Sequence, residues 1–287
     1  MAGLALVVLT TGSLVAYRYF FERGVTYGDA RLEAMPHTDA PEIGVNTFLH
    51  LESDIAAIDR ELAALKTAGI GIIRQQFLWE EIEEQAKGDF VNYRNGAPTW
   101  ARYDAIVAAA DAAGIEILAR LERPPRWAVS DWDPELPGSQ SPPDDLADFG
   151  DFVEAVVGRY AGKVRYFQIW NEPNLWGEWG ERDPDAAEYA QMLRVAYTRA
   201  KAANPEVVIV LAGLAPTTER GPRNLSDTLF LERLYVLGAQ VHFDVAASMS
   251  YGLFTGPHDV RIGERWTNFP RAVLWREIMV AYGDTDK

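Results

Sequence analysis

The chain contains no cysteine, and this absence removes two kinds of protein. Without thiols, neither a disulfide framework nor a thiolate metal site can form. The four histidines show no His-x-x-x-His pairing of the kind that holds zinc on a helix face, so no metal site is expected. No Gly-x-Gly-x-x-Gly follows an apolar run, and Gly-Lys-Ser/Thr is missing, so no cofactor with a cradled phosphate is expected.

Basic residues are scarce, since Lys and Arg total 27 against 42 for Asp and Glu, giving a net charge of −15. Binding of nucleic acid needs a basic face, so this balance argues against such a partner. It is compatible with neutral ligands such as sugars, and equally with simple solubility. The 287 residues, 48% of them hydrophobic, suit a globular protein with one large core or two small ones.

The N-terminal run from residue 2 to 17 carries no charge and is mostly Leu, Val, Ala and Gly. We expect residues 1–23 to form an apolar helix that anchors the protein in a membrane, because no charged residue interrupts the run at helical period. A cleaved signal peptide is the rival interpretation, although a basic start and a clear Ala-x-Ala site are missing. Both predict an extracytoplasmic protein, membrane-anchored or secreted. A polar linker, 24–41, then leads to the main domain, 42–287.

From residue 43 onward, apolar runs typical of strands alternate with amphipathic helical stretches. Such repetition is typical of parallel βαβ units. The expected strands are 43–49, 71–77, 115–121, 164–170, 207–214 and 243–249. The expected helices are 53–68, 100–113, 144–160, 185–203, 229–237 and 266–281.

Residues capable of chemistry lie in or just after several of these strands, and this distribution chooses between two parallel architectures. They are Asn46, Arg74, Trp79, Glu80, Glu122, Asn171, Glu172 and Tyr251. A barrel carries functional groups at many strand ends, whereas an open doubly wound sheet concentrates them at one switch point. The sequence therefore predicts a (β/α)₈ TIM barrel of which about six of eight βα units are present.

The most informative of these strand ends is Asn171-Glu172, which follows the apolar run that ends at Trp170. A carboxyl group among tryptophans suits a general acid, because an apolar surround raises its pKa. The alternative is a strand end followed by a solvated turn, since Asn, Glu and Pro all suit turns.

Several motifs in order resemble clan A glycoside hydrolases, especially families 39 and 5. The segment Ile-Trp-Asn-Glu-Pro-Asn, residues 169–174, resembles the motif of the fourth strand. Ile-Gly-Val-Asn at 43–46 is similar to the first strand, and Arg74 with Trp79 and Glu80 is similar to the second strand and its loop. Pro-Pro-Arg-Trp-Ala at 124–128 resembles the turn after the third.

The resemblance implies a retaining hydrolase of β-linked oligo- or polysaccharides. Glu172 would be the acid/base, protonating the leaving oxygen and then deprotonating the water. Asn171 would bind the sugar 2-hydroxyl, and Arg74 would keep the nucleophile ionised, unless its role is an ion pair that braces the strands. Trp79 would be a pocket wall. Tyr251 is similar to an aromatic residue that can contact the nucleophile.

Two features depart from, or extend, that pattern. Met249 stands where the family often has a histidine two residues before the tyrosine, so any substrate contact of that histidine is not expected here. Loop tryptophans stack well on sugar faces, so we expect them to form subsites, with packing as the equal alternative. These are Trp127, Trp132, Trp176 and Trp179.

A retaining mechanism needs a second carboxylate about 5 Å from the first. In clan A it comes from the end of the seventh strand, and the pattern counts six strands. We therefore expect the nucleophile beyond Lys287, and a chain of 287 residues that is inactive by itself. Glu80, Glu81, Glu122 and Asp131 are poor substitutes, and Glu122 more plausibly contacts substrate or pairs with an arginine.

Alternatives to the enzyme remain open at this point. The barrel could bind carbohydrate without cleaving it, be an inactive fragment, or be a structural membrane-anchored domain. The motifs do not choose among xyloside, glucoside, mannoside or other glycans, nor between exo and endo action.

Overall fold

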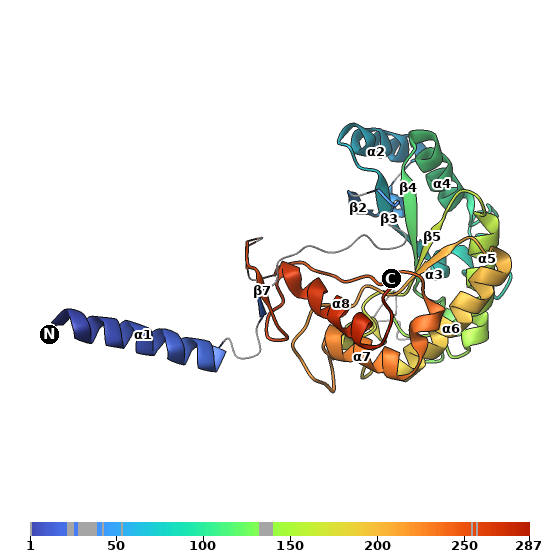
Figure 1. The fold of residues 1–287 in the computed structure, drawn as a ribbon. Helices are drawn as coiled ribbons and strands as arrows, with labels where there is room; N and C mark the ends of the chain where they lie inside the picture. Colours follow the sequence, from blue (N-terminus) through green and yellow to red (C-terminus); the bar gives the residue numbers. More distant parts are fainter. Residues whose placement is uncertain are drawn as a thin grey trace.

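A computed structural model describes residues 2–21, 26–27, 39–41, 43–52, 54–131, 140–253, 255–256 and 258–287 (Figure 1). An N-terminal helix, α1, spans Ala2–Phe21, and a short strand β1 (Thr26–Tyr27) pairs antiparallel with β7 (Arg261–Ile262). None of the helices in these ranges is both long and apolar enough to cross a membrane. The expected membrane anchor therefore finds no support in the structure.

The main domain is built on a parallel sheet of five strands in the order β2-β3-β4-β5-β6. Because this spatial order follows the sequence, the strands wind in one direction, as in a barrel, and do not reverse as in a doubly wound sheet. The strands are β2 (Gly44–Thr47), β3 (Ile72–Leu78), β4 (Glu116–Glu122), β5 (Tyr166–Ile169) and β6 (Val208–Val210).

Helices alternate with the strands, as the sequence predicts. They are α2 (Ile55–Thr67), the short α3 (Trp79–Ile82), α4 (Ala101–Ala113), α5 (Leu146–Arg159), α6 (Ala186–Ala203), α7 (Asp227–Val236) and α8 (Ala272–Ala281). Three of them begin at an aspartate whose carboxylate accepts a backbone N–H: Asp54, Asp145 and Asp185. Helix α4 ends at Gly114, whose φ of 62° suits a residue without Cβ.

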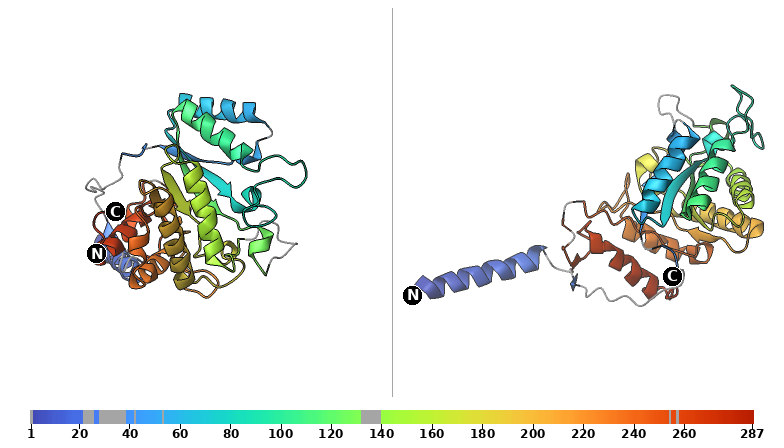
Figure 2. Two further views of the ribbon diagram at one scale, coloured as in Figure 1. Left: turned by 90° about the vertical axis from the view of Figure 1, so that its right-hand side faces the viewer. Right: turned by 90° about the horizontal axis from the view of Figure 1, so that it is seen from above.

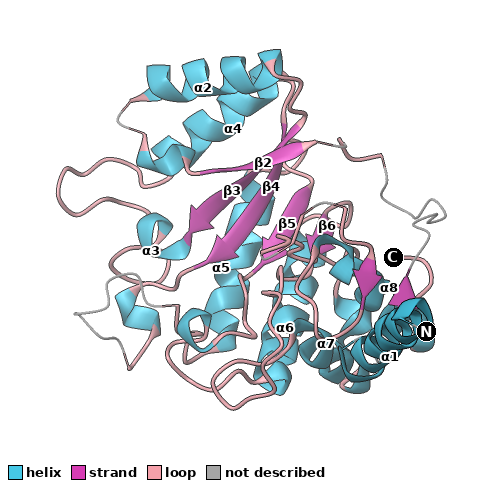
Figure 3. Ribbon diagram, turned by 90° about the vertical axis from the view of Figure 1, so that its left-hand side faces the viewer, coloured by secondary structure: helices cyan, strands magenta, loops and turns pink. Residues whose placement is uncertain are grey.

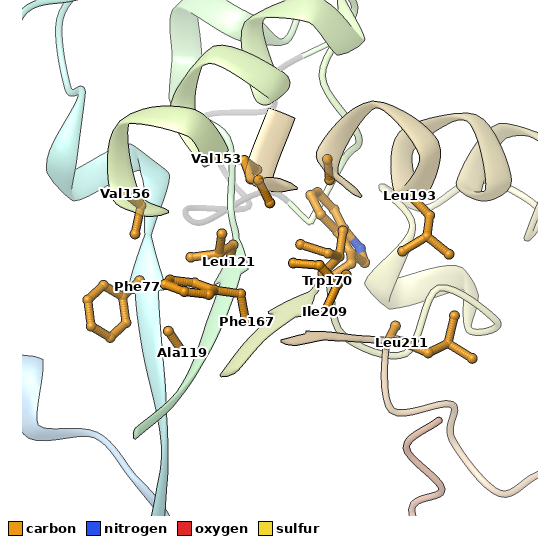
Figure 4. Packing of buried hydrophobic residues seen from close by; sticks show 14 of the residues in the cluster. Phe77, Ala119, Leu121, Val153, Val156, Phe167, Trp170, Leu193, Ile209 and Leu211 are labelled. Atoms are coloured by element: carbon orange, nitrogen blue, oxygen red, sulfur yellow. The ribbon is translucent and has the colours of Figure 1, made fainter. Parts of the chain in front are cut away.

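One face of the sheet packs against the helices and forms the core. Helix α5 lies in front of the strands in the left view of Figure 2 and behind them in Figure 3. Alternate strand residues point to this side because side chains in a strand change face at every residue. Phe77, Ala119, Leu121, Phe167 and Ile209 meet α5 and α6 there (Figure 4).

The opposite face, which would be the inside of a barrel, has two layers. Its lower layer is a small apolar cluster of Tyr166, Val208 and Val210, against which Leu118 and Ile72 pack. Toward the carboxyl ends of the strands the same face becomes polar. The register pairs Gln76 with Arg120 and Arg120 with Gln168 in neighbouring strands. The fold is therefore an incomplete (β/α)₈ barrel whose inner face is apolar at the bottom and polar at the top.

The expected sixth strand, 243–249, does not form a regular strand. Two isolated parallel bridges, Val210 to Val245 and Leu214 to Ser248, take its place. The carboxylate of Asp244 accepts the N–H of Ile209 over 2.8 Å, so that donor is not available to a strand carbonyl. After Val245 come Ala246, Ala247 and Ser248, which are small and lack the β-branched side chains that favour strands.

Candidate active site

The carboxyl end of β5 turns sharply and exposes Glu172 to the inner face. Trp170 and Glu172 both have positive φ, 73° and 41°, which is rare for residues with a Cβ and is typical of functional sites. The turn is held in place by backbone bonds from Trp170 N to Leu121 O over 3.0 Å and from Glu172 N to Gly213 O over 3.1 Å. The strained backbone thus places the Glu172 side chain where the apolar strand ends.

Two arginines on neighbouring strands converge on Asn171. Arg74 Nη2 donates to Asn171 Oδ1 over 3.0 Å, and Arg120 Nη1 donates to the same oxygen over 3.1 Å. Arg74 also donates to Gln168 over 2.6 Å and to Asn46 over 3.2 Å. One guanidinium therefore ties the ends of three strands together, which needs the several fixed donors of an arginine.

The amide nitrogen of Asn171 faces the other way. It donates to Oε2 of Glu178 over 3.2 Å. Glu178 ends a short 3-10 turn, Trp176–Glu178, and its backbone carbonyl accepts the indole N–H of Trp170 over 3.0 Å. A second carboxylate therefore lies beside the Asn171-Glu172 pair.

Burial raises the pKa of Glu172 to about 7, and the negative charge of Glu178 adds to that rise. The cations Arg74 and Arg120 oppose it, while Glu122 raises the pKa further. A carboxyl group that is protonated near neutral pH can donate a proton to a leaving group, so Glu172 has the property of a general acid.

Arg120 also forms an ion pair with the fully buried Glu122, at 2.7 Å between Nη2 and Oε1. Gln76 donates to the same oxygen over 2.7 Å. The other oxygen, Oε2, has no hydrogen-bond partner among the described residues. Of the two roles expected for Glu122, pairing with an arginine is thus the one seen.

A pocket of ≈ 250 Å³ opens beside these groups. It is lined by Asn46, Thr47, Phe48, Arg74, Gln76, Arg120, Asn171, Glu172, Met249 and Tyr251. Tyr251 is 57% exposed, and its hydroxyl donates to the sulfur of Met249 over 3.3 Å. Four residues expected from the sequence, namely Glu172, Asn171, Arg74 and Tyr251, therefore line a single pocket.

Two of the tryptophans expected to bind substrate are instead core residues. Trp79 and Trp179 are each 0% exposed. Trp79 stacks on Phe152 at 5.3 Å and donates to Glu83 over 2.6 Å, so the expectation that it forms a pocket wall is replaced by a packing role. Trp179 packs edge-on against Trp170 at 5.7 Å, with no face open to a sugar.

The remaining loop tryptophans differ from these two. Trp127 is partly buried and donates to the carbonyl of Glu83 over 2.8 Å. Trp176 is also partly buried, and the guanidinium of Arg223 lies 4.3 Å from its ring centre. Neither lines the pocket at Glu172. Trp132 lies outside the described residues.

Four polar residues of this site, namely Arg120, Gln76, Gln168 and Glu178, were not expected from the sequence. Arg120, Gln76 and Gln168 point to the inner face, and alternation along their strands was the available signal, since Arg74 with Gln76 and Arg120 with Glu122 are each two residues apart. Glu178 follows Glu172 in a loop, where no periodicity predicts direction.

Comparison with solved structures identifies the architecture. A family 39 glycoside hydrolase from Bacteroides cellulosilyticus WH2 is 21% identical, over 72% of this chain and 37% of its own, with a TM-score of 0.52. A β-xylosidase from Caulobacter crescentus CB15 is 22% identical, over 78% and 44%, with a TM-score of 0.52. An endo-β-1,4-mannanase from Thermotoga petrophila is 14% identical, over 86% and 60%, with a TM-score of 0.56.

These likenesses establish the fold. The chain has the fold of clan A glycoside hydrolases, in the form of an incomplete barrel. It spans less than half the length of the family 39 enzyme and of the xylosidase. No protein-family model matches the chain, and no curated protein sequence does.

Proposed function

We propose that the protein is a retaining glycoside hydrolase that acts on β-linked glycans, with Glu172 as its general acid/base. The observation that supports this most is the pKa of Glu172, about 7, at the carboxyl end of a barrel strand and beside a pocket. Glu172 protonates the glycosidic oxygen as the bond breaks, and the resulting carboxylate then removes a proton from the attacking water.

The neighbours of Glu172 orient and polarise the substrate. Asn171 has a second N–H that no described residue accepts, and it forms a hydrogen bond with the sugar 2-hydroxyl, a contact of the kind that strengthens in the transition state. Arg74 and Arg120 bring two positive charges to the floor of the pocket. Burial and Arg120 lower the pKa of Arg74 to about 10, so it stays charged at neutral pH.

We place the nucleophile in a segment encoded after Lys287. Two carboxyl groups of a retaining enzyme lie about 5 Å apart. Within the described ranges, the carboxylates that affect Glu172 are Glu122 and Glu178. Glu122 is fully buried and paired, so it does not reach a sugar carbon. The two guanidiniums, Arg74 and Arg120, are suited to hold an incoming carboxylate ionised.

Turnover of aryl β-glycosides tests this proposal. We call the protein that includes the segment encoded after Lys287 the extended protein. It is expected to hydrolyse a nitrophenyl β-xyloside, β-glucoside or β-mannoside, whereas the 287-residue chain is expected to show negligible turnover. If the 287-residue chain, purified to homogeneity, still turned over substrate at a steady rate, the proposal that the nucleophile lies after Lys287 would be contradicted. A reading frame that closes at Lys287 would contradict it as well.

A carbohydrate-binding barrel without activity is the second candidate. The burial and pairing of Glu122 favour it, because they remove one of the two described carboxylates that affect Glu172 from chemistry. Calorimetry with xylo-, cello- and manno-oligosaccharides separates the two functions: binding by the extended protein without any turnover supports this candidate over the enzyme.

An extracytoplasmic location is a separate proposal, supported by the uncharged run at residues 2–17. A fusion of residues 1–41 to a reporter that is active only outside the cytoplasm tests it. An inactive reporter would contradict export.

A further inference from the structure

Glu178 is a carboxylate of the site to which the mechanism above gives no role. Its backbone is fixed on both sides by fully buried indoles. The carbonyl of Glu178 accepts from Trp170 Nε1 over 3.0 Å, and the next residue, Trp179, donates to Glu188 over 3.2 Å. The side chain therefore leaves a rigid turn and is partly buried against Asn171.

Three charged groups together determine how the Asn171 amide is oriented. Both lone pairs of its oxygen are taken, one by Arg74 at 3.0 Å and one by Arg120 at 3.1 Å. Its nitrogen gives one hydrogen to Glu178 at 3.2 Å. If the amide flipped, its NH₂ would face two guanidiniums and its oxygen would face a carboxylate, so all three contacts would become repulsive.

Glu178 also completes the charges that face Glu172. Arg74 comes from β3, Arg120 and Glu122 come from β4, and Glu178 comes from the turn after β5. The exposed Tyr251 lines the same pocket. With Glu178 ionised, two cations are matched by two anions around Glu172. Without it the cations are in excess, which favours ionised Glu172 and weakens it as an acid.

We propose that Glu178 is a positioning residue for the reaction: it holds the Asn171 amide with one N–H turned toward the substrate, and it acts as the negative partner that keeps Glu172 in its acid form. This inference rests on the proposed function for its use in catalysis. The two effects of Glu178, on the orientation of the Asn171 amide and on the protonation of Glu172, do not require turnover. Both can therefore be tested in the 287-residue chain.

Two variants separate the two effects. Glu178→Gln removes the charge but keeps an oxygen that can accept from Asn171. Glu178→Asp keeps the charge but withdraws the carboxylate by one methylene from Asn171. Glu181→Gln is the matched control, because Glu181 is an exposed carboxylate in the same loop with no hydrogen bond to Asn171.

The measurement is a titration of the Glu172 carboxyl carbon by NMR in glutamate-labelled protein, with the Asn171 side-chain amide followed alongside. We expect Glu178→Gln to lower the pKa of Glu172 by about one unit, and Glu181→Gln to leave it within about 0.2 units. We expect Glu178→Asp to shift the Asn171 amide resonances and to change the pKa of Glu172 less than Glu178→Gln does.

An unchanged Glu172 titration in Glu178→Gln, or one equal to that of Glu181→Gln, would overturn the inference. Should Glu178→Gln fail to fold, Glu178→Asp still tests the amide, and unchanged Asn171 resonances in it would overturn the inference. Turnover of aryl glycosides by the extended protein is scored separately. A pKa shift without any turnover means that the proposed function fails and this arrangement stands.

Discussion

Arg74 on β3 donates a hydrogen bond to the side-chain oxygen of Asn171, just beyond β5, over 3.0 Å. Between these strands lies β4, so the contact crosses the inner face of the sheet. It holds Asn171, the residue next to the proposed acid, against Arg74 in the lining of the pocket. The site is thus organised by strands distant in sequence, and not only by the loop that carries Glu172.

Replacing Arg74 tests whether its geometry or its charge matters more. Arg74→Lys keeps the charge, but a single ammonium group cannot reach Gln168, Asn46 and Asn171 together. We expect sugar affinity in the extended protein to fall roughly tenfold in calorimetry, with little change in the pKa of Glu172. Arg74→Met should in addition raise that pKa. Equal affinity of Arg74→Lys and wild type, with Arg126→Lys as the exposed control, would contradict this role.

The raised pKa of Glu172 predicts a pH-dependent stability. The folded state holds the proton more tightly than the unfolded chain does, so the stabilisation is complete below the ordinary value of 4.5 and is lost as pH rises through about 7. Glu172→Gln removes this titration. We expect the variant to be more stable than wild type by about 2 kcal/mol at pH 8, allowing for partial exposure, and to differ little at pH 4.5. Urea unfolding at both pH values measures it; a difference independent of pH would be inconsistent with a raised pKa.

The ion pair of Asp227 and Arg271 is expected to contribute to the free energy of unfolding without contacting the site at Glu172. Both side chains are almost fully buried, with Nη2 2.7 Å from Oδ1, and the indole of Trp275 donates to the same carboxylate over 2.9 Å. Asp227→Asn leaves a buried guanidinium without its counter-charge, which costs roughly 3 kcal/mol. Thermal unfolding followed by tryptophan fluorescence checks this.

The control for that prediction is an exposed pair. Arg220 and Glu264 lie 3.4 Å apart with side chains 67% and 60% exposed, so Glu264→Gln is expected to change stability by less than about 0.5 kcal/mol. Similar losses in Asp227→Asn and Glu264→Gln would show that burial of the first pair is not decisive.

Trp79 is expected to behave as a core residue. Trp79→Phe loses volume and leaves a carboxylate oxygen of Glu83 without its indole donor, which costs about 2 kcal/mol. Sugar affinity should stay unchanged, because the indole does not line the pocket. A loss of affinity in calorimetry with stability intact would restore the role expected from the sequence.

Much of the fold can be predicted from the local sequence pattern. Where the structure differs from that prediction, the difference has a physical reason. The alternation of apolar runs and amphipathic stretches predicts β2 to β6 and their helices, and Gly114 marks a helix end. The run at 243–249 has the apolar pattern of a strand but does not form one, because the carboxylate of Asp244 accepts the backbone N–H of Ile209 that a sixth strand would need.

The residues of the site, like the fold, can be predicted from the sequence only in part. Asn171 and Glu172 are predictable because a strand end fixes their direction. The burial of Trp79 and Trp179 is not, because it depends on which aromatic rings from other elements pack around them. Glu178 is missed because a loop residue gains its role only when the turn folds back onto Asn171.

The central claim is that Glu172 protonates the leaving group, and the dependence of rate on the leaving group tests it most directly. In the extended protein, kcat/KM of wild type and Glu172→Ala is measured on β-glycosides whose aryl leaving groups span a range of pKa. Removal of the acid is expected to cost about 10²–10⁴-fold on poor leaving groups and far less on dinitrophenyl glycosides, which need no protonation. A uniform loss across the series, or none on an unactivated glycoside, would contradict the assignment.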